Sequence, residues 1–185
     1  MGTGSAEFAR NGASVTSADF SQTAVETTRS LLKEANLAAN VLQADATALL
    51  FKKDTFDCVY SFGVLHHIPD IGKALSEIKR VLKPGGQLMV MLYNQDSLLY
   101  GYSIVYLRGI REGLLKKLTM DELLARYSER KEDNPYIKVY TKSEAQALFS
   151  TYFESCSVID VPDRYELGWH LIIKGRKPRI KYGAG

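Results

Sequence analysis

The stretch Gly2-Thr3-Gly4-Ser5-Ala6-Glu7, followed by a strand-like run at residues 14–19, decides the predicted fold. Glycines lack a Cβ atom and let the backbone approach a ligand closely, and a helix that begins at Ser5 points its free N–H groups at that ligand. Gly12 then ends the helix, and the run that follows stops at Asp19. A glycine loop, a helix and an acidic strand end are typical of a half-site for a nucleotide cofactor, whose ribose hydroxyls bind the acid.

Beyond Asp19 the chain alternates between helix and strand patterns. We expect a helix capped by Ser21 that ends near residue 36, and an amphipathic helix over residues 71–82 that Lys83-Pro84-Gly85-Gly86 stops. Strands are expected at residues 14–19, 40–44, 55–61 and 87–93. Strands that alternate with helices pair in parallel through right-handed crossovers, so the sequence predicts an α/β fold with a Rossmann-like, doubly wound, mostly parallel sheet.

From Ser97 the pattern changes, and we expect a helical cap inserted after the strand at residues 87–93. This strand is the fifth if a first central strand, which is expected to be absent, is counted. A helix over residues 98–118 opens the cap. Capping boxes at Thr119 and Thr141, each with Glu three residues later, start two more helices before any further strand. The linker at residues 131–138 is expected to be a surface loop.

The C-terminal part predicts an antiparallel edge hairpin. Its strands are expected at residues 155–161 and 168–174, joined by a turn near Pro162-Asp163. The predicted organisation is a single domain over residues 1–185. Its parts are a cofactor-binding half at 1–96, the helical cap at 97–150, the edge hairpin at 151–177 and a basic tail at 178–185.

Composition excludes several classes of protein. The 185 residues are 45% hydrophobic and 24% charged, enough for one domain with a sizeable core. The longest apolar run, residues 98–107, is far shorter than the roughly 20 residues that span a bilayer. A net charge of +3 gives no reason to expect a nucleic-acid partner. Cys58 and Cys156 are expected to be buried free thiols, in keeping with a reducing, cytoplasmic location.

Together these segments resemble the class I S-adenosylmethionine-dependent methyltransferases, in particular the small-molecule enzymes of that superfamily. The most specific part of the resemblance is FDCVYSFGVLHHIPD at residues 56–70, continued by EIKRVLKPGG at residues 77–86. The resemblance implies S-adenosyl-L-methionine as cofactor and S-adenosyl-L-homocysteine as product, with methyl transfer to a small-molecule acceptor. A nicotinamide-dependent oxidoreductase is disfavoured, because its glycine pattern needs a small residue where Glu7 stands.

The resemblance also assigns cofactor-binding residues. Gly2 and Gly4 match the last two glycines of the family's loop, near the methionine part of the cofactor. Asp19 matches the ribose-binding acid, and Phe20 lies beside the adenine. Further matches are Asp45 and Ala46, which read the adenine edge by carboxylate and backbone N–H, and the cofactor-cleft residues Ser61, Phe62 and Leu65. Two simpler interpretations stay open: the glycines belong to a frayed terminus, and the acids are ordinary strand-end carboxylates.

His66 and His67 are the candidate catalytic residues. Methyl transfer is an in-line displacement, so holding the acceptor and methyl group collinear in a dry site supplies most of the catalysis. A hydroxyl or protonated amine acceptor must also lose a proton, and a neutral histidine suits that task, with His66 the first candidate and His67 the second. A metal site is not expected, because adjacent side chains project differently and no third ligand has suitable spacing.

The sequence departs from the family at its start. One residue precedes Gly2, so we expect the first motif glycine and the first central strand to be absent. The two neighbouring strands would lose ladder hydrogen bonds, and each buried unpaired group costs roughly 1–3 kcal/mol. We therefore expect a homodimer formed by domain swapping of N-terminal elements, or direct pairing of the two strands within one chain. The alternative function is a truncated or degenerate methyltransferase-fold protein with weak or no cofactor binding and no activity.

Overall fold

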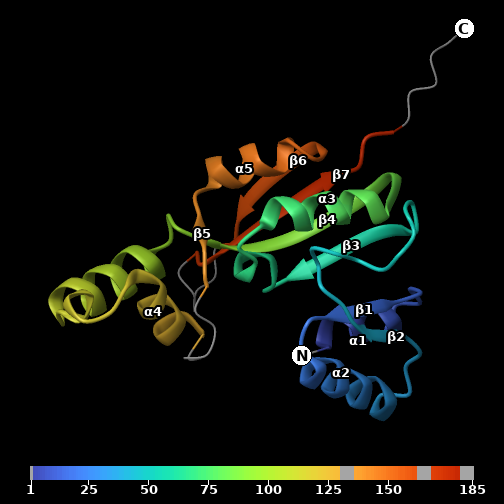
Figure 1. Cartoon of the computed structure of the whole chain (residues 1–185), viewed down its shortest axis with the longest axis horizontal. Coiled ribbons are helices and arrows are strands. Elements are labelled where there is room, and N and C mark those ends of the chain that lie inside the picture. Colours follow the sequence, from blue (N-terminus) through green and yellow to red (C-terminus); the bar gives the residue numbers. More distant parts are fainter. Residues whose placement is uncertain (1, 130–135, 162–167, 180–185) are drawn as a thin grey trace, which may run out of the picture. The chain divides into compact units, whose positions relative to one another are not determined.

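The computed structural model describes residues 2–129, 136–161 and 168–179 (Figure 1). The chain forms two compact units, Met1–Phe51 and Lys52–Gly185, which are described in turn. The expected turn at Pro162-Asp163, most of the expected linker and the end of the basic tail lie outside the described residues. The predicted division of a single domain at residues 96, 150 and 177 stays a prediction.

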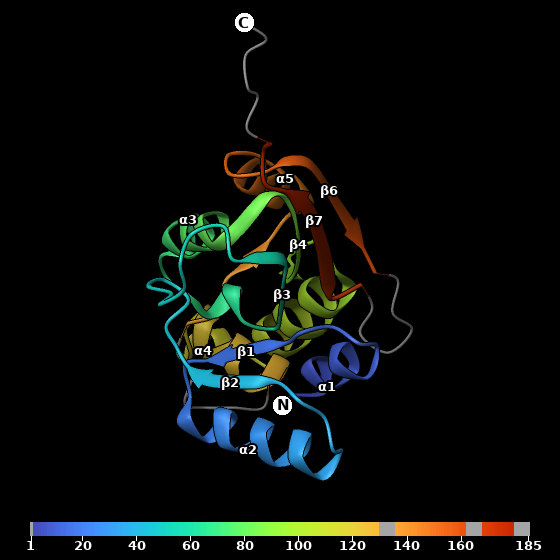
Figure 2. The same ribbon diagram turned by 90° about the vertical axis from the view of Figure 1, so that its right-hand side faces the viewer.

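The first unit consists of two helices and a two-stranded parallel sheet. Its elements are α1 (Thr3–Arg10), β1 (Thr16–Asp19), α2 (Gln22–Glu34) and β2 (Asn40–Gln43). Figure 2 shows β1 and β2 side by side, and they pair in register from Thr16 with Asn40 to Asp19 with Gln43. The Ser21 hydroxyl accepts the predicted capping bond from the Ala24 N–H at 3.4 Å.

The start of α1 differs from the prediction. The helix begins at Thr3, two residues before Ser5, so Gly4 lies in its first turn. Gly2 caps it with φ 77°, a left-handed conformation that favours glycine. A Cβ atom at Gly2 would lie 3.0 Å from the Thr28 side chain, so glycine also lets the start of α1 pack closely on α2.

The second unit is built on a five-stranded sheet. The strands are β3 (Phe56–Phe62), β4 (Leu82–Asn94), β5 (Val139–Tyr140), β6 (Glu154–Asp160) and β7 (His170–Arg176). They follow the order β3-β4-β7-β6, and β5 also pairs with β4. β3 and β5 are parallel to β4, whereas β7 is antiparallel to both β4 and β6. The predicted doubly wound α/β fold with an antiparallel edge hairpin is confirmed.

Two helices cover one face of this sheet. They are α3 (Ile71–Val81), which contacts β4, and α5 (Lys142–Ser150), which contacts β6 and β7. A Cβ atom on Gly72 of α3 would lie 3.0 Å from the Tyr152 hydroxyl, just after α5, so the two helices lie side by side. Leu88, Val90 and Ile173 are buried beneath them.

The opposite face of the sheet is more exposed. Tyr60 and Phe62 of β3 are 41% and 48% exposed and lie on this face with Cys58. Cys58 is therefore exposed, and the prediction that it is buried is wrong. Both cysteines are free thiols.

The helices after β4 differ in two ways from the expected cap. Residues 99–111 form a π-helix, η2 (Leu99–Arg111), followed by η3 (Leu114–Lys116), α4 (Met120–Leu124) and the π-helical η4 (Ala125–Glu129). The capping boxes at Thr119 and Thr141 are both formed, as predicted. However, the short strand β5 precedes α5, so the prediction of three helices before any further strand is wrong.

One further boundary differs. Residues 83–86 were expected to form a turn after the helix, but β4 begins at Leu82 and includes them. The strand accommodates them through a bulge opposite the Phe56–Cys58 segment, with Gly85 at φ 78°. No helix in the described part of the chain is long and apolar enough to cross a membrane.

A lysine joins the end of β7 to the start of β3 and the end of α3. The Lys177 ammonium donates to the Asp54 carboxylate at 2.6 Å and to the Leu82 carbonyl at 2.7 Å. Its side chain is only 17% exposed. The hydrogen bond from Lys177 is the main reason that the pKa of Asp54 lies below its ordinary value. The lysine therefore links three segments that are distant in the sequence.

We predict that Lys177→Met lowers the free energy of unfolding by about 1.5–3 kcal/mol, because the charged hydrogen bond to the buried Leu82 carbonyl is lost. Lys174→Met, at an exposed position of β7, is the control and should change little. The pKa of Asp54 is lower in the folded protein than in the unfolded chain, so ionised Asp54 adds to the free energy of unfolding. This stabilisation is complete above about pH 4 and is lost as the pH falls through the pKa of the folded protein. Urea titrations at neutral and acidic pH should show the Lys177 effect shrinking in acid; an equal effect of both substitutions would contradict the assignment.

Candidate functional site

The parallel pairing of β1 and β2 brings two predicted acids to one edge of the first unit. Asp19 ends β1 opposite Gln43, the last residue of β2, and Asp45 follows two residues later. The Asp19 carboxylate accepts a hydrogen bond from the Ser21 N–H at 2.9 Å. The Asp45 carboxylate accepts from the Thr47 N–H at 2.7 Å and the Thr47 hydroxyl at 2.8 Å. Both side chains are thus oriented by the loops that they begin.

An aromatic ring lies beside these acids. Phe20 is 74% exposed, and the Gln43 side chain fixes its loop by donating to the Phe20 carbonyl at 2.8 Å. Ala46 is half-buried next to Asp45. An exposed ring face and two carboxylates at one sheet edge fit an adenosine group, which offers a planar base, two ribose hydroxyls and an amine.

The glycine segment is held beside β1. The Ser5 hydroxyl of α1 donates to the Ser17 hydroxyl of β1 at 3.0 Å. The first turn of α1, which contains Gly4, therefore has a defined position within the first unit. Its early N–H groups have no partner within the helix and are suited to a polar or anionic ligand group. Cofactor contacts by Gly2 and Gly4 stay a prediction.

In the second unit, the chain turns sharply after β3. Gly63 has φ 76°, and the short helix η1 (Leu65–His67) follows. Of the three residues expected beside the cofactor here, Phe62 is exposed, Ser61 is half-buried and Leu65 is only 1% exposed. Phe62 is therefore the one whose side chain is most open to a ligand.

The two histidines of η1 differ in burial. His66 is fully buried, and its ring centroid lies 3.8 Å from that of Tyr93 and 4.2 Å from that of His67. His67 is half-buried, and its Nδ1 atom lies 3.2 Å from the Tyr136 carbonyl oxygen. The ring of His66 is therefore less accessible to a substrate than the ring of His67, and a role as proton acceptor stays a prediction for both.

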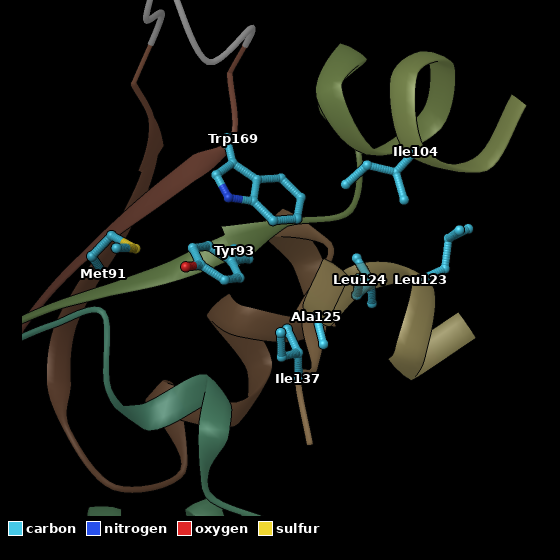
Figure 3. Packing of buried hydrophobic residues seen from close by; sticks show 8 residues of the cluster. All are labelled: Met91, Tyr93, Ile104, Leu123, Leu124, Ala125, Ile137 and Trp169. Carbon is cyan, nitrogen blue, oxygen red and sulfur yellow. The ribbon is translucent and has the colours of Figure 1, made fainter. Parts of the chain in front are cut away.

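A row of aromatic rings extends from these histidines to the sheet surface. Tyr93 of β4 stacks on Trp169 with ring centroids 4.4 Å apart, and its centroid lies 6.1 Å from that of His170. Figure 3 shows the side chains of Tyr93 and Trp169 next to each other. His170 in turn lies 5.7 Å from Phe62, at the end of β3. Trp169 and His170 were not predicted from the sequence as residues of this region. Only the antiparallel register that pairs Tyr93 with His170 reveals them.

Comparisons with known proteins show which proteins this chain is similar to. Residues 1–90 match the profile of a family described as "Methyltransferase domain". A demethylmenaquinone methyltransferase from Clavibacter sepedonicus is 37% identical over 119 residues, which cover 62% of this chain and 47% of that protein. A ubiquinone/menaquinone biosynthesis C-methyltransferase from Marinomonas sp. is 41% identical over 81 residues, covering 42% of this chain and 32% of that protein.

Solved structures show the same fold. The crystal structure of an S-adenosylmethionine-dependent methyltransferase from Methanosarcina mazei matches 95% of this chain and 87% of its own, with a TM-score of 0.68 and 19% identity. The chain spans a third to a half of the length of the two curated relatives. The family match at residues 1–90 includes the predicted site residues from Gly2 to His67, while the similarity in fold extends over almost the whole chain.

We predict that His66→Ala lowers the free energy of unfolding by about 2–4 kcal/mol, because it leaves a cavity among stacked aromatic rings. His67→Ala removes a half-buried ring and should lower the free energy of unfolding by clearly less than His66→Ala does. Urea titrations of the two variants test this difference. If His66→Ala were as stable as the unsubstituted protein, the assignment of His66 to the core would be wrong.

Proposed function

We propose that this chain, a member of the class I S-adenosylmethionine-dependent methyltransferase superfamily, transfers a methyl group to a small-molecule acceptor. The observation that carries the proposal is the placement of Asp19, Phe20 and Asp45 at one edge of the parallel pair β1 and β2. This edge fits adenosine and lies within the residues that match the methyltransferase domain. The same match makes a degenerate protein without cofactor binding the less favoured alternative.

The residues assigned by the resemblance would hold the cofactor. Asp19 would bind the ribose hydroxyls, Phe20 would stack on the adenine, and Asp45 with the Ala46 N–H would bind the adenine edge. Gly2 and Gly4 are proposed to lie near the methionine part, and Ser61, Phe62 and Leu65 are the further residues proposed to bind the cofactor. When bound, S-adenosyl-L-methionine supplies an electrophilic methyl group on a positively charged sulfur.

His67 is the residue that we propose takes the acceptor's proton. Its Nδ1 atom faces the Tyr136 carbonyl oxygen at 3.2 Å, and an N–H at this position would donate to that oxygen. This tautomer leaves Nε2 as the basic atom, and the hydrogen bond holds the ring in one orientation. His66 would support His67 by packing against its ring.

The acceptor that we propose is a planar conjugated ring. Two relatives are named for demethylmenaquinone and for ubiquinone or menaquinone biosynthesis, and a quinone contains such a ring. In this chain Phe62 and His170, whose centroids lie 5.7 Å apart, present aromatic surface at the end of β3. An acceptor ring stacked on them would be held in place without a charged contact.

We further propose that the chain works as a homodimer. Among the described strands, β1 pairs with β2 alone, and β3 is an edge strand that pairs with β4 alone. Unpaired N–H and C=O groups along such edges favour pairing with another strand. A second copy that exchanges its N-terminal elements would supply that strand. The cytoplasmic location stays a prediction.

We predict that Asp19→Ala weakens the binding of S-adenosyl-L-methionine at least tenfold, because charge-assisted hydrogen bonds to ribose hydroxyls are lost. Asp19→Asn keeps an oxygen that can accept from the Ser21 N–H but removes the charge, and should also weaken binding. Glu34→Ala, at the exposed end of α2, is the matched control. Calorimetric titration, with a urea titration of each variant to confirm folding, measures the effect; equal affinity in all four proteins would refute the ribose assignment.

A further inference from the structure

The π-helix η2 and the residue before it carry an apolar stripe that faces solvent. Leu98, Tyr102, Tyr106 and Ile110 are 64%, 55%, 48% and 62% exposed. They are four residues apart, about one turn of a helix with i→i+5 hydrogen bonds. The rings of Tyr102 and Tyr106 stack at 5.7 Å. The stripe is therefore a continuous surface of large side chains.

The stripe lies outside the core that anchors the same helix. Ile104 is 1% exposed and points into the cluster around Leu123, Leu124 and Trp169 (Figure 3). Five residues later, Gly109 is buried so tightly that a Cβ atom would lie 2.7 Å from the Leu115 side chain. This inner face fixes η2 on the second unit. Leu98, Tyr102, Tyr106 and Ile110 are not needed for that packing.

Positive charge follows the stripe directly. Residues 97–118 contain one acidic residue, Glu112, and its carboxylate accepts from Arg108 at 2.7 Å. Arg111, Lys116 and Lys117 are exposed, and none of them forms an ion pair with another described residue. Residues 98–117 therefore combine an exposed apolar surface on η2 with uncompensated positive charge at the last residue of η2 and in the segment that follows it.

We propose that this surface docks the chain on an anionic phospholipid bilayer, with η2 lying in the plane of the interface. Tyrosine rings suit the boundary between the headgroups and the acyl chains, because they are apolar with one polar end. Leu98 and Ile110 would enter the acyl region. Arg111, Lys116 and Lys117 would meet the anionic headgroups, each contributing to the attraction. An anionic bilayer has an apolar interior and negatively charged headgroups, so it complements both the apolar stripe and the basic residues. The proposal concerns attachment alone and does not rest on methyl transfer.

Sedimentation with vesicles tests the charge requirement. The chain should bind vesicles of phosphatidylglycerol and phosphatidylcholine more tightly than vesicles of phosphatidylcholine alone. The triple variant Arg111→Gln, Lys116→Gln, Lys117→Gln should bind on the order of 100-fold more weakly, at about fivefold for each charge removed. The variant Lys33→Gln, Lys52→Gln, Lys73→Gln has the same net charge and alters exposed lysines elsewhere, so it should bind as the original protein does.

The apolar stripe has its own test. Tyr102→Ser with Tyr106→Ser should weaken vesicle binding at least tenfold, whereas Leu50→Ser with Ile159→Ser, also at exposed positions, should not. A reporter variant, Tyr106→Trp, should show blue-shifted fluorescence with anionic vesicles. The native Trp169 is only 3% exposed and gives a constant background, and Ile159→Trp is the control that should not shift.

Two outcomes would overturn the proposal. One is equal binding of anionic vesicles by the charge variant and its control. The other is that the folded protein does not bind anionic vesicles; if sedimentation velocity then shows that the two tyrosines hold a dimer together, a second copy covers the stripe. Circular dichroism of each variant establishes that it is folded before either outcome is scored.

Discussion

Parallel pairing of strands is the constraint on which the candidate site depends. Two strands joined by a crossover helix must run in the same direction, so their carboxyl ends meet at one edge of the sheet. The helix α2 joins β1 to β2 in this way, and α3 joins β3 to β4. Asp19 ends β1 and Asp45 follows β2, while Phe62 and Tyr93 lie at the ends of β3 and β4. Each unit thereby gathers residues that are more than twenty positions apart in the sequence.

The same constraint explains how the aromatic row forms. β7 runs antiparallel to β4 and places its first residue, His170, opposite Tyr93 near the carboxyl end of that strand. Trp169 directly precedes β7, and its ring stacks on that of Tyr93. The backbone supports this arrangement, because the Asn94 N–H donates to the Trp169 carbonyl at 2.7 Å. An edge hairpin outside the most specific part of the resemblance, residues 56–86, thus places Trp169 and His170 next to Tyr93, which packs against His66.

Local signals predicted much of the fold. The capping boxes at Thr119 and Thr141, and the cap at Ser21, depend on residues within one turn, so they were located to the residue. Longer-range features were missed. The pairing of β5 with β4 and the extension of β4 through residues 83–86 depend on partners elsewhere in the chain. The π-helical hydrogen bonding of η2 has no sequence signal of its own. Tertiary packing likewise decides which of the two adjacent histidines is buried, and the local sequence does not indicate this difference.

The central claim is that this chain binds S-adenosyl-L-methionine. Isothermal calorimetry of the purified chain with that cofactor, and with S-adenosyl-L-homocysteine in competition, tests the claim most directly. We predict saturable binding of one molecule per chain, displaced by S-adenosyl-L-homocysteine and unaffected by a nicotinamide dinucleotide. A folded protein that releases no heat with either sulfur compound at several temperatures would contradict the claim.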